Sequence, residues 1–283
     1  MGTYKGTGTA ETITPAFVSS SVSREPAESL PSAAADSIDG GGRGDVLSGG
    51  GGNDLIYDQP AYRSPSPGSS LSVAVTANDG NVVHGDAGND DITVEVGDTD
   101  GANPVGNIAY GDGGDDSVLF RLSARNYPDS LWESAPTGTV TLYGGAGNDL
   151  TSVRGYYVGL SPGMTVYQHG GAGNDELLAT ADEFDPDSSV RGSNNNDYLY
   201  GDTGNDNYRV MEAKDTVVER AGEGADTVFA WEMDYVLPAY VENLEMTGGY
   251  YPEGRHATGN GLNNLIRIDR WWDGDYTIDG MAG

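Results

Sequence analysis

The chain has 283 residues and carries 44 acidic against 14 basic side chains, which gives a formal net charge of −30 at pH 7. So strong a negative charge argues against nucleic acids and anionic membrane surfaces as partners, since both repel it. The chain has no cysteine, so disulfide bonds are excluded. Because only 36% of its residues are hydrophobic and 44 are glycine, a thin core shared between stacked coils is expected rather than a large compact one.

Residues 1–30 are rich in Ser, Thr and Pro and contain two short strand-like runs, Thr12–Thr14 and Ala16–Val18. They lack the apolar central region of a secretory signal peptide. No run of 18 apolar residues occurs anywhere in the chain, so no transmembrane segment is expected. We interpret 1–30 as a leader or an imperfect first coil.

A six-residue motif, Gly-Gly-Ala-Gly-Asn-Asp, then dominates the chain. It occurs at 144–149 and 170–175, and close relatives occur at 49–54, 85–90, 111–116 and 201–206. Looser copies begin at Gly40 and Gly192, where Arg43 and the run Ser193–Asn195 replace glycines of the motif. Repetition of one short unit is typical of a solenoid, in which each coil buries its apolar side only against its neighbours.

The chemistry of the motif indicates a cation site. Glycines allow backbone conformations that a Cβ forbids, so several carbonyl oxygens can face one point, and the closing aspartate adds a carboxylate. Hard oxygen donors without sulfur or imidazole suit Ca²⁺. The aspartates predicted to bind calcium are Asp45, Asp54, Asp90, Asp116, Asp149, Asp175, Asp197 and Asp206. The glycines predicted to shape these sites are Gly49, Gly85, Gly111, Gly144, Gly170 and Gly201 in the first position, and Gly52, Gly88, Gly114, Gly147, Gly173 and Gly204 in the fourth.

An apolar residue stands two places after the aspartate in most copies, which predicts that a strand begins where each turn ends. These residues are Ile56, Ile92, Val118, Leu177, Leu199 and Tyr208. The alternation of Ile92, Val94 and Val96, followed by the returning run Asn107–Tyr110, predicts two strands in each enlarged coil.

The spacing of the copies predicts on which edge of the solenoid each turn lies. Motif starts fall at residues 40, 49, 85, 111, 144, 170, 192 and 201. A nine-residue spacing makes a half-coil, so such neighbours lie on opposite edges, while the longer gaps fit enlarged full coils. We expect one regular, calcium-bearing edge and one variable edge. The regular edge is predicted to hold Asp54, Asp90, Asp116, Asp149, Asp175 and Asp197, and the other edge Asp45 and Asp206.

Beyond Tyr208 the repeat degenerates. Asp226 keeps the aspartate position, but Asn264 stands where an aspartate would be, so tight calcium binding is not expected there. Residues 278–283 have the pattern of an opening repeat, and we expect the chain to be cut inside it. The predicted divisions are 1–30, a calcium-binding roll over 31–210, and degenerate coils over 211–283.

These units, over roughly residues 31–283, resemble the glycine- and aspartate-rich nonapeptide repeats of RTX, or hemolysin-type, calcium-binding proteins. The resemblance implies an all-β fold, a parallel β-roll whose ions sit between stacked turns, and about six ions in this chain. It also implies export by a type I system that reads a C-terminal signal. Such proteins fold outside the cell, where calcium is plentiful, so the expected location is extracellular or at the cell surface.

Several other features have plain structural explanations. Gly159–Gly163 matches the G-x-S-x-G pattern of lipases, but the strand-like run Met164–Tyr167 follows where the pattern requires a helix. Two acidic clusters, 98–101 and 182–187, are interpreted as solvated loops, with additional calcium sites as the alternative. Trp271 and Trp272 are expected to pack against the last coil, or else to bind a partner.

The histidines are scattered, and no zinc-protease or phosphate-loop motif is present. His84 and His169 directly precede motif turns, at the coil position where Tyr110 and Tyr143 also occur, which indicates a surface position on a strand. We therefore expect no enzymatic activity from these residues.

Two functions remain open, together with a mode of assembly. The first is a secreted calcium-binding protein with a structural, surface or adhesion role. The second is the non-catalytic RTX part of a larger secreted enzyme or toxin. Self-assembly through the open strand edges at the ends of the solenoid is the further possibility.

Overall fold

The computed structural model of the protein describes residues 2–6, 12–27, 29–34, 36–40, 45–52, 54–58, 81–97, 106–123, 138–156, 164–182, 195–247, 255–268 and 276–281. All regular secondary structure in these ranges is β-strand. They contain no helix long and apolar enough to cross a membrane.

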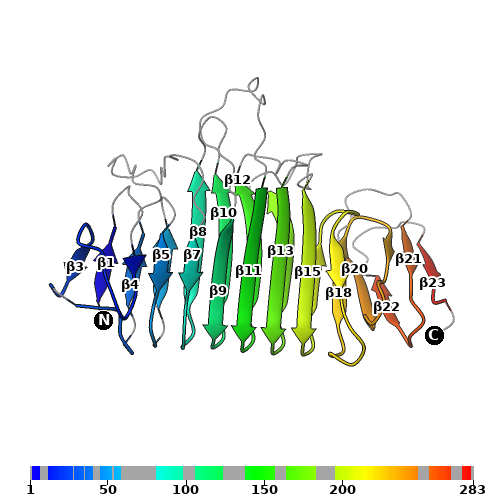
Figure 1. Ribbon diagram of the computed structural model, residues 1–283. Coiled ribbons are helices and arrows are strands. Elements are labelled where there is room, and N and C mark those ends of the chain that lie inside the picture. The colour runs from blue at the N-terminus through cyan, green and yellow to red at the C-terminus, as the bar shows by residue number, and fades with distance from the viewer. Residues whose placement is uncertain are drawn as a thin grey trace, which may run out of the picture.

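Two long sheets make up most of the molecule (Figure 1). Sheet A has twelve strands, in the spatial order β3 (Ser23–Glu25), β1 (Thr3–Lys5), β4 (Ser37–Asp39), β6 (Leu55–Asp58), β8 (Asp91–Gly97), β10 (Ser117–Ser123), β12 (Leu150–Tyr156), β14 (Glu176–Asp182), β16 (Asn207–Val210), β18 (Thr227–Trp231), β20 (Asn243–Thr247) and β22 (Leu265–Ile268). Sheet B has eight, in the order β2 (Thr12–Ile13), β5 (Val46–Ser48), β7 (Val82–His84), β9 (Asn107–Gly113), β11 (Gly138–Ala146), β13 (Met164–Ala172), β15 (Asn196–Thr203) and β17 (Thr216–Val218). A smaller C-terminal sheet joins β19 (Tyr235–Val236), β21 (His256–Thr258) and β23 (Thr277–Asp279).

The chain alternates between the sheets, so each coil contributes one strand to each layer. From β4 onward every neighbouring pair in sheet A is parallel, and so is every pair in sheet B. At the N-terminal end β1 pairs in parallel with β4 and antiparallel with β3. The fold is a parallel β-roll with enlarged coils in the middle, as the repeat predicts.

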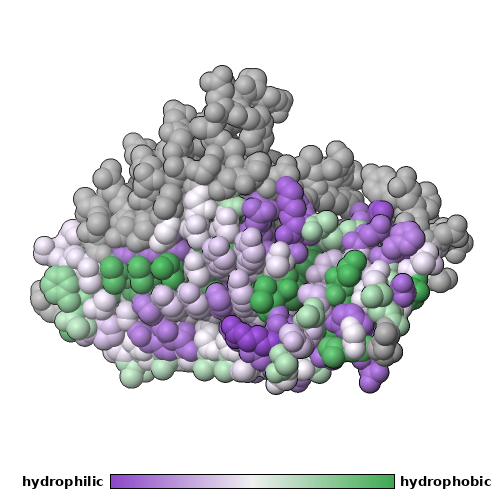
Figure 2. Space-filling model, turned by 45° about the vertical axis from the view of Figure 1, so that its right-hand side comes forward, coloured by the Kyte–Doolittle hydropathy of each residue, from purple (hydrophilic) through white to green (hydrophobic). Residues whose placement is uncertain are grey.

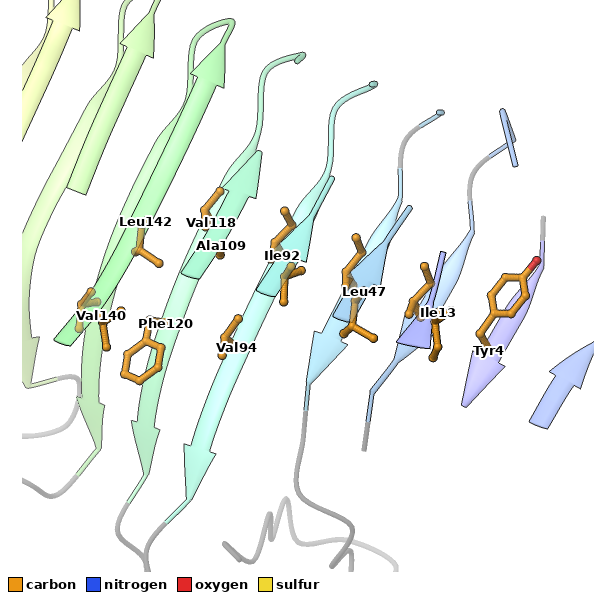
Figure 3. Close-up of a cluster of buried hydrophobic side chains, with 14 of the residues drawn as sticks. Tyr4, Ile13, Leu47, Ile92, Val94, Ala109, Val118, Phe120, Val140 and Leu142 are labelled. Atoms are coloured by element: carbon orange, nitrogen blue, oxygen red, sulfur yellow. The ribbon is translucent and has the colours of Figure 1, made fainter. Parts of the chain in front are cut away.

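The core is a thin layer between the two sheets. Successive side chains of a strand point to opposite faces, so every second residue is buried. Figure 3 shows these side chains following one another from coil to coil. In register along sheet A the inward column is Tyr4, Ile38, Ile56, Ile92, Val118, Thr151, Leu177, Tyr208, Val228 and Leu244. In sheet B it is Ile13, Leu47, Val83, Ala109, Leu142, Gln168, Leu199 and Val217.

One polar pair interrupts this apolar column. Gln168 is fully buried, and its side-chain oxygen accepts a hydrogen bond of 2.8 Å from Thr151 Oγ1. Its side-chain nitrogen donates to the carbonyl oxygen of Leu178 at 2.8 Å. The apolar core divides here into two clusters, one ending at Val166 and the other beginning at Leu177. Because the buried amide is hydrogen-bonded at both atoms, the interruption carries no unsatisfied polar group.

The outer face of sheet B carries a ladder of stacked aromatic rings. His84, Tyr110, Tyr143, His169 and Tyr200 lie on five consecutive strands, with ring centroids 4.5–4.8 Å apart and nearly parallel planes. This spacing equals the strand separation of a sheet, so parallel pairing by itself aligns the rings. The two histidines therefore occupy the surface strand position that their sequence context predicts.

Figure 2 shows hydrophobic surface in small separate groups among polar ones.

Some expectations fall on residues outside the described ranges. These are the position of Arg43 in the first loose copy, the Gly159–Gly163 pattern, the acidic clusters at 98–101 and 182–187 apart from Asp182, the first three residues of the copy beginning at Gly192, and Trp271 with Trp272. Sheet A continues across the predicted boundary at residue 210, since β16 pairs with β18.

Candidate metal centre in the stacked aspartate turns

Six copies of the motif form a row of turns along one edge of the roll, the lower edge in Figure 1. Each turn leads from a strand of sheet B to the next strand of sheet A, for example from β11 to β12. The row comprises residues 49–54, 85–90, 111–116, 144–149, 170–175 and 201–206. We call this edge the aspartate edge.

The turns share one backbone conformation. The second and fourth positions have positive φ in all six copies, between 65° and 118° at the second and between 103° and 146° at the fourth. The fourth position is always glycine. The second is glycine in three copies and Asp86, Asp112 or Asp202 in the others, because aspartate tolerates the left-handed region near 70° better than most residues.

Close stacking explains the glycines. A Cβ on Gly147 would overlap the carbonyl oxygen of Gly114 in the preceding turn, and Gly173 stands in the same relation to Gly147. The first glycine has another role, since a Cβ on Gly144 would lie 2.6 Å from Asp149 Oδ2 and 2.6 Å from the carbonyl oxygen of Gly170. The absent side chain leaves space beside the carboxylate and beside a carbonyl of the next turn.

The aspartates themselves form a ladder of hydrogen bonds. The backbone N–H of each aspartate donates to Oδ1 of the aspartate in the next turn. The donor-to-acceptor distances are 2.6 Å for Asp36 to Asp54, 2.5 Å for Asp54 to Asp90, 2.8 Å for Asp90 to Asp116, 2.7 Å for Asp116 to Asp149, 2.8 Å for Asp149 to Asp175, 2.8 Å for Asp175 to Asp206 and 2.9 Å for Asp206 to Asp226. One oxygen of each carboxylate is therefore used by the backbone.

The second oxygen has no donor. Oδ2 is buried without a hydrogen-bond partner in Asp54, Asp90, Asp116, Asp149, Asp175 and Asp206. These six residues are only 1–3% exposed. A buried carboxylate oxygen without a donor is costly in a folded protein, and a repeated row of them is the arrangement expected where a cation is the partner.

The pKa values show the same imbalance. Burial, opposed by the backbone hydrogen bond and reinforced by neighbouring carboxylates, raises the pKa of Asp54, Asp116 and Asp175 to about 7. It raises the pKa of Asp90 and Asp149 to about 6. The charged form of these side chains is thus unfavourable unless a cation stands beside it.

The residues present fit Ca²⁺. The ligands available in each layer are a carboxylate oxygen and backbone carbonyl oxygens, of which the carbonyl of Gly170 near Asp149 is one. Neither imidazole nor sulfur takes part, which favours a hard cation with oxygen ligands. Calcium would neutralise the buried charge and supply the missing partner of Oδ2.

A second ladder holds the turns in register on the solvent side. The backbone N–H of Asn148 donates to Asp115 Oδ1 at 2.8 Å, and that of Asn174 donates to Asn148 Oδ1 at 2.9 Å. The backbone N–H of Asn205 donates to Asn174 Oδ1 at 2.8 Å. Here each side chain accepts from the following turn, opposite in direction to the aspartate ladder, so adjacent turns are tied in both directions.

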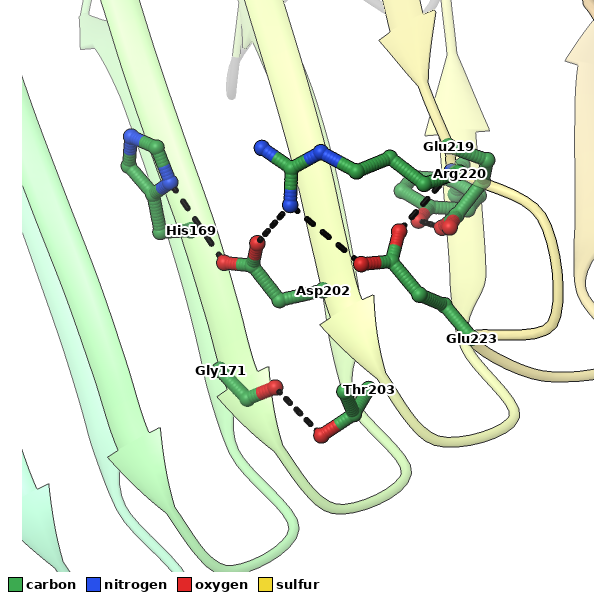
Figure 4. Close-up of polar contacts among 8 residues, drawn as sticks. His169, Gly171, Asp202, Thr203, Glu219, Arg220 and Glu223 are labelled. Carbon is green, nitrogen blue, oxygen red and sulfur yellow. Dashed lines mark hydrogen bonds and ion pairs between the residues drawn. The ribbon is translucent and has the colours of Figure 1, made fainter.

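Two carboxylates at the second position, those of Asp112 and Asp202, contact side chains on the outer face of sheet B. His84 Nδ1 lies 2.8 Å from Asp112 Oδ2. Asp202 lies between His169 and Arg220, at 3.6 Å and 3.7 Å, and Arg220 also pairs with Glu223 at 3.2 Å (Figure 4). Asp202 thus has a cationic partner in Arg220.

The opposite edge does not repeat this arrangement. In register, its equivalent column is Asp45, Asn81, Asn107, Val140, Val166, Asp197 and Asp215. Asp45 N–H donates to Asn81 Oδ1 at 2.8 Å, so part of the backbone ladder survives. Two asparagines and two valines separate Asp45 from Asp197, which makes this the variable edge.

The prediction for two aspartates was wrong. Asp206 belongs to the aspartate edge and Asp197 to the variable edge, the reverse of the expected placement. The turns at 170–175 and 201–206 are the ones that stack, and Asp197 pairs with Val166 on the other edge. Asp45, Asp54, Asp90, Asp116, Asp149 and Asp175 lie on the edges predicted for them.

The ladder continues beyond the motif turns at both ends of the row. At the N-terminal end, Asp36 Oδ2 accepts from the backbone N–H of Ser32 at 2.8 Å. Toward the C-terminus, Asp226 N–H donates to Glu242 Oε2 at 2.9 Å. In the turn that contains Asn264, its side-chain nitrogen donates to the carbonyl oxygens of Val241 and Glu242, both at 3.2 Å. Here an amide donates to the neighbouring turn in the place where the motif has a carboxylate.

Sequence reasoning missed Glu219. This residue is buried, with one oxygen that has no hydrogen-bond partner, and it lies with Asp206 and Asp226 in a group whose ligand oxygens are within 4.8 Å of one another. No local sequence pattern marks it, because its partners Asp206 and Asp226 come from neighbouring layers.

The fold and the edge define a β-roll whose stacked turns present buried carboxylates to cations. The RTX calcium-binding nonapeptide repeat family matches residues 32–57, 137–151 and 187–208. The chain therefore contains RTX calcium-binding repeats, and the resemblance seen in the sequence is confirmed.

One relative is an enzyme. The chain is 37% identical over 89 residues to endo-1,3-1,4-beta-glycanase ExsH of Rhizobium meliloti (strain 1021). This alignment takes in 28% of the present chain and 18% of the glycanase, so the chain spans under a fifth of that relative's length. No solved structure matches the chain.

Proposed function

We propose that the chain is a secreted protein that stays unfolded in a calcium-poor cytoplasm and folds into its β-roll when calcium fills the aspartate edge outside the cell. The observation that carries this proposal is the row of six buried Oδ2 atoms without donors. A net charge of −30 opposes compaction, and cations bound along one edge would offset part of it. Binding free energy then becomes folding free energy.

Folding on calcium suits export through a type I system, because an unfolded acidic chain can be moved before it meets millimolar calcium. Once folded, the roll is a rigid calcium-bound solenoid with a structural, surface or adhesion role and no catalysis of its own. The support for this role is that the buried charged groups of the aspartate edge are arranged toward cations, in a row that extends over six coils.

A circular dichroism titration tests the proposal. The expected result is a largely disordered spectrum in calcium-free buffer and a cooperative gain of β-structure as calcium rises to millimolar levels. Magnesium at the same concentration is the matched control, since it demands a tighter octahedral shell and keeps its waters. A spectrum that stays the same from zero to millimolar calcium would refute calcium-dependent folding.

A second candidate function is the non-catalytic RTX part of a larger secreted enzyme. The likeness to the glycanase favours it, because that relative extends well beyond the region that aligns. An assay on a mixed-linkage 1,3-1,4-β-glucan, run with the folded chain in calcium, separates catalysis within these residues from a supporting role. Light scattering in the same titration would reveal self-assembly.

A further inference from the structure

Glu219 occupies a column that is otherwise glycine. β15 and β17 pair so that Tyr200 faces Val218, which places Gly201 beside Glu219. In the preceding coils the same register position holds the first glycine of each turn, such as Gly170 beside Gly201. The last layer of sheet B therefore carries a carboxylate where every motif turn before it carries no side chain.

The Glu219 side chain reaches back into the space that Gly201 leaves open. A Cβ built on Gly201 would contact Glu219 Oε1 at 2.7 Å and would overlap Asp206 Oδ2. The ligand oxygens of Asp206, Glu219 and Asp226 all lie within 4.8 Å of one another. A calcium ion with oxygens at about 2.4 Å can bridge oxygens at that separation.

Two of these oxygens lack a donor. Asp206 is 1% exposed and Glu219 is 7% exposed, and Asp206 Oδ2 and Glu219 Oε2 are both buried without a hydrogen-bond partner. Their other oxygens are occupied, because Asp206 Oδ1 accepts from Asp175 N–H at 2.8 Å and Glu219 Oε1 accepts from the hydroxyl of Tyr208. One oxygen of each of these two carboxylates is thus left without a donor.

A substitution in sheet A accompanies the one in sheet B. The inward residue after the turn is aliphatic or Thr151 in the preceding motif coils, but it is Tyr208 here, and its hydroxyl holds the Glu219 carboxylate. A tyrosine and a glutamate that replace an aliphatic residue and a glycine in one layer, and contact each other, indicate a built site rather than an accidental acidic cluster.

We propose that Asp206, Glu219 and Asp226 form a three-carboxylate calcium site that closes the C-terminal end of the aspartate edge. It differs from the repeat layers in drawing its third carboxylate from outside the motif. Affinity for Ca²⁺ rises with the number of charged ligands, so this site fills at lower free calcium than the layers built on repeat aspartates alone. The inference rests on the proposed calcium binding by the roll.

Equilibrium dialysis of the full chain against stepped concentrations of free calcium tests the site. The wild type should bind about one calcium ion at roughly tenfold lower free calcium than it binds its other calcium ions. This difference is expected because the site has an added charged ligand. Glu219→Gln should lose this ion, because the glutamine oxygen still accepts from Tyr208 while the amide can donate to Asp206. Asp226→Asn, which keeps the acceptor for Asp206 N–H, should lose the same ion.

Two control variants make the outcomes distinct. Glu245→Gln removes an identical charge from an outward position on β20 and should retain the tight ion. Asp149→Asn changes a central layer. It should retain the tightly bound ion and weaken the binding of the calcium ions that fill at higher free calcium. Circular dichroism in saturating calcium verifies the fold of each variant.

A tight ion that survives in folded Glu219→Gln and Asp226→Asn would overturn the site, as would failure of both variants to fold at any calcium concentration. If Asp149→Asn still weakens the binding of the calcium ions that fill at higher free calcium, the proposed function stands without the site. If no variant alters calcium binding, both the site and the proposed function fail.

Discussion

Lowering the pH should substitute in part for calcium. Burial raises the pKa of Asp54, Asp116 and Asp175 from 3.8 to about 7 in the cation-free roll. Between these values the folded state holds more protons than the unfolded state, so its stability falls as pH rises through the window and is recovered as pH falls. This is the reverse of a salt-bridged aspartate, which stabilises a fold at high pH.

The size of the effect follows from the same pKa values. One pKa unit corresponds to about 1.4 kcal/mol, so each of these three aspartates destabilises the cation-free roll by about 4 kcal/mol above pH 7. Even half that value for each amounts to about 6 kcal/mol, comparable with the whole stability of a typical domain, about 5–15 kcal/mol. The cation-free chain is therefore expected to be unfolded at pH 8 and to gain β-structure as pH falls from 7 toward 5.

The assay is far-UV circular dichroism in metal-stripped buffers between pH 8 and pH 5. The triple variant Asp54→Asn, Asp116→Asn, Asp175→Asn is the matched comparison, because asparagine keeps the Oδ1 acceptor and removes the titrating charge. It should show more β-structure than the wild type at pH 8 without calcium, and a weaker dependence on pH. A wild-type chain that is fully folded at pH 8 without metal, or a triple variant with an unchanged pH profile, would refute the reasoning.

Two further predictions concern single turns. Gly147→Ala should destabilise the calcium-loaded roll by about 1–3 kcal/mol in urea denaturation, because its φ is 143° and the new Cβ would overlap the Gly114 carbonyl; Gly261→Ala, where a Cβ has open space, is the control, and equal effects would contradict the stacking argument. Asn264→Asp should lower thermal stability in metal-free buffer by about 1–3 kcal/mol, because it removes the donor to the Val241 and Glu242 carbonyls. Added calcium should recover part of that loss, and a variant as stable as the wild type without metal would contradict the role of the amide.

The local structure could be predicted because it depends on residues close in sequence. Glycine at the fourth position and an apolar residue after the aspartate are enough to define a turn followed by a strand, as at Gly147 and Ile92. The assignment of Asp197 and Asp206 to edges could not be settled from spacing, because enlarged coils and half-coils give overlapping intervals. Only strand pairing shows that Asp206 stacks on Asp175.

Residues outside the repeat were harder to find. Gln168 looks like any strand residue until its register places it inward against Thr151 on the facing sheet. Glu219 lies 13 residues beyond Asp206, in a turn that has lost the motif. Its role depends on the open space at Gly201 in the neighbouring layer, which no local pattern reports.

The side chains in register with the motif aspartates differ along the roll in how their polar atoms find partners, and three arrangements occur. In Asp36 the second oxygen takes a backbone N–H from Ser32, and in Asn264 an amide donates directly to facing carbonyls. Neither arrangement needs a metal. Between them, from Asp54 to Asp206, the second oxygen is buried with no donor. Because all three solutions share the same strand spacing and pairing, the fold can change from one to the next without a break in sheet A, and the motif carboxylates without a donor are confined to the coils between Asp36 and Asn264.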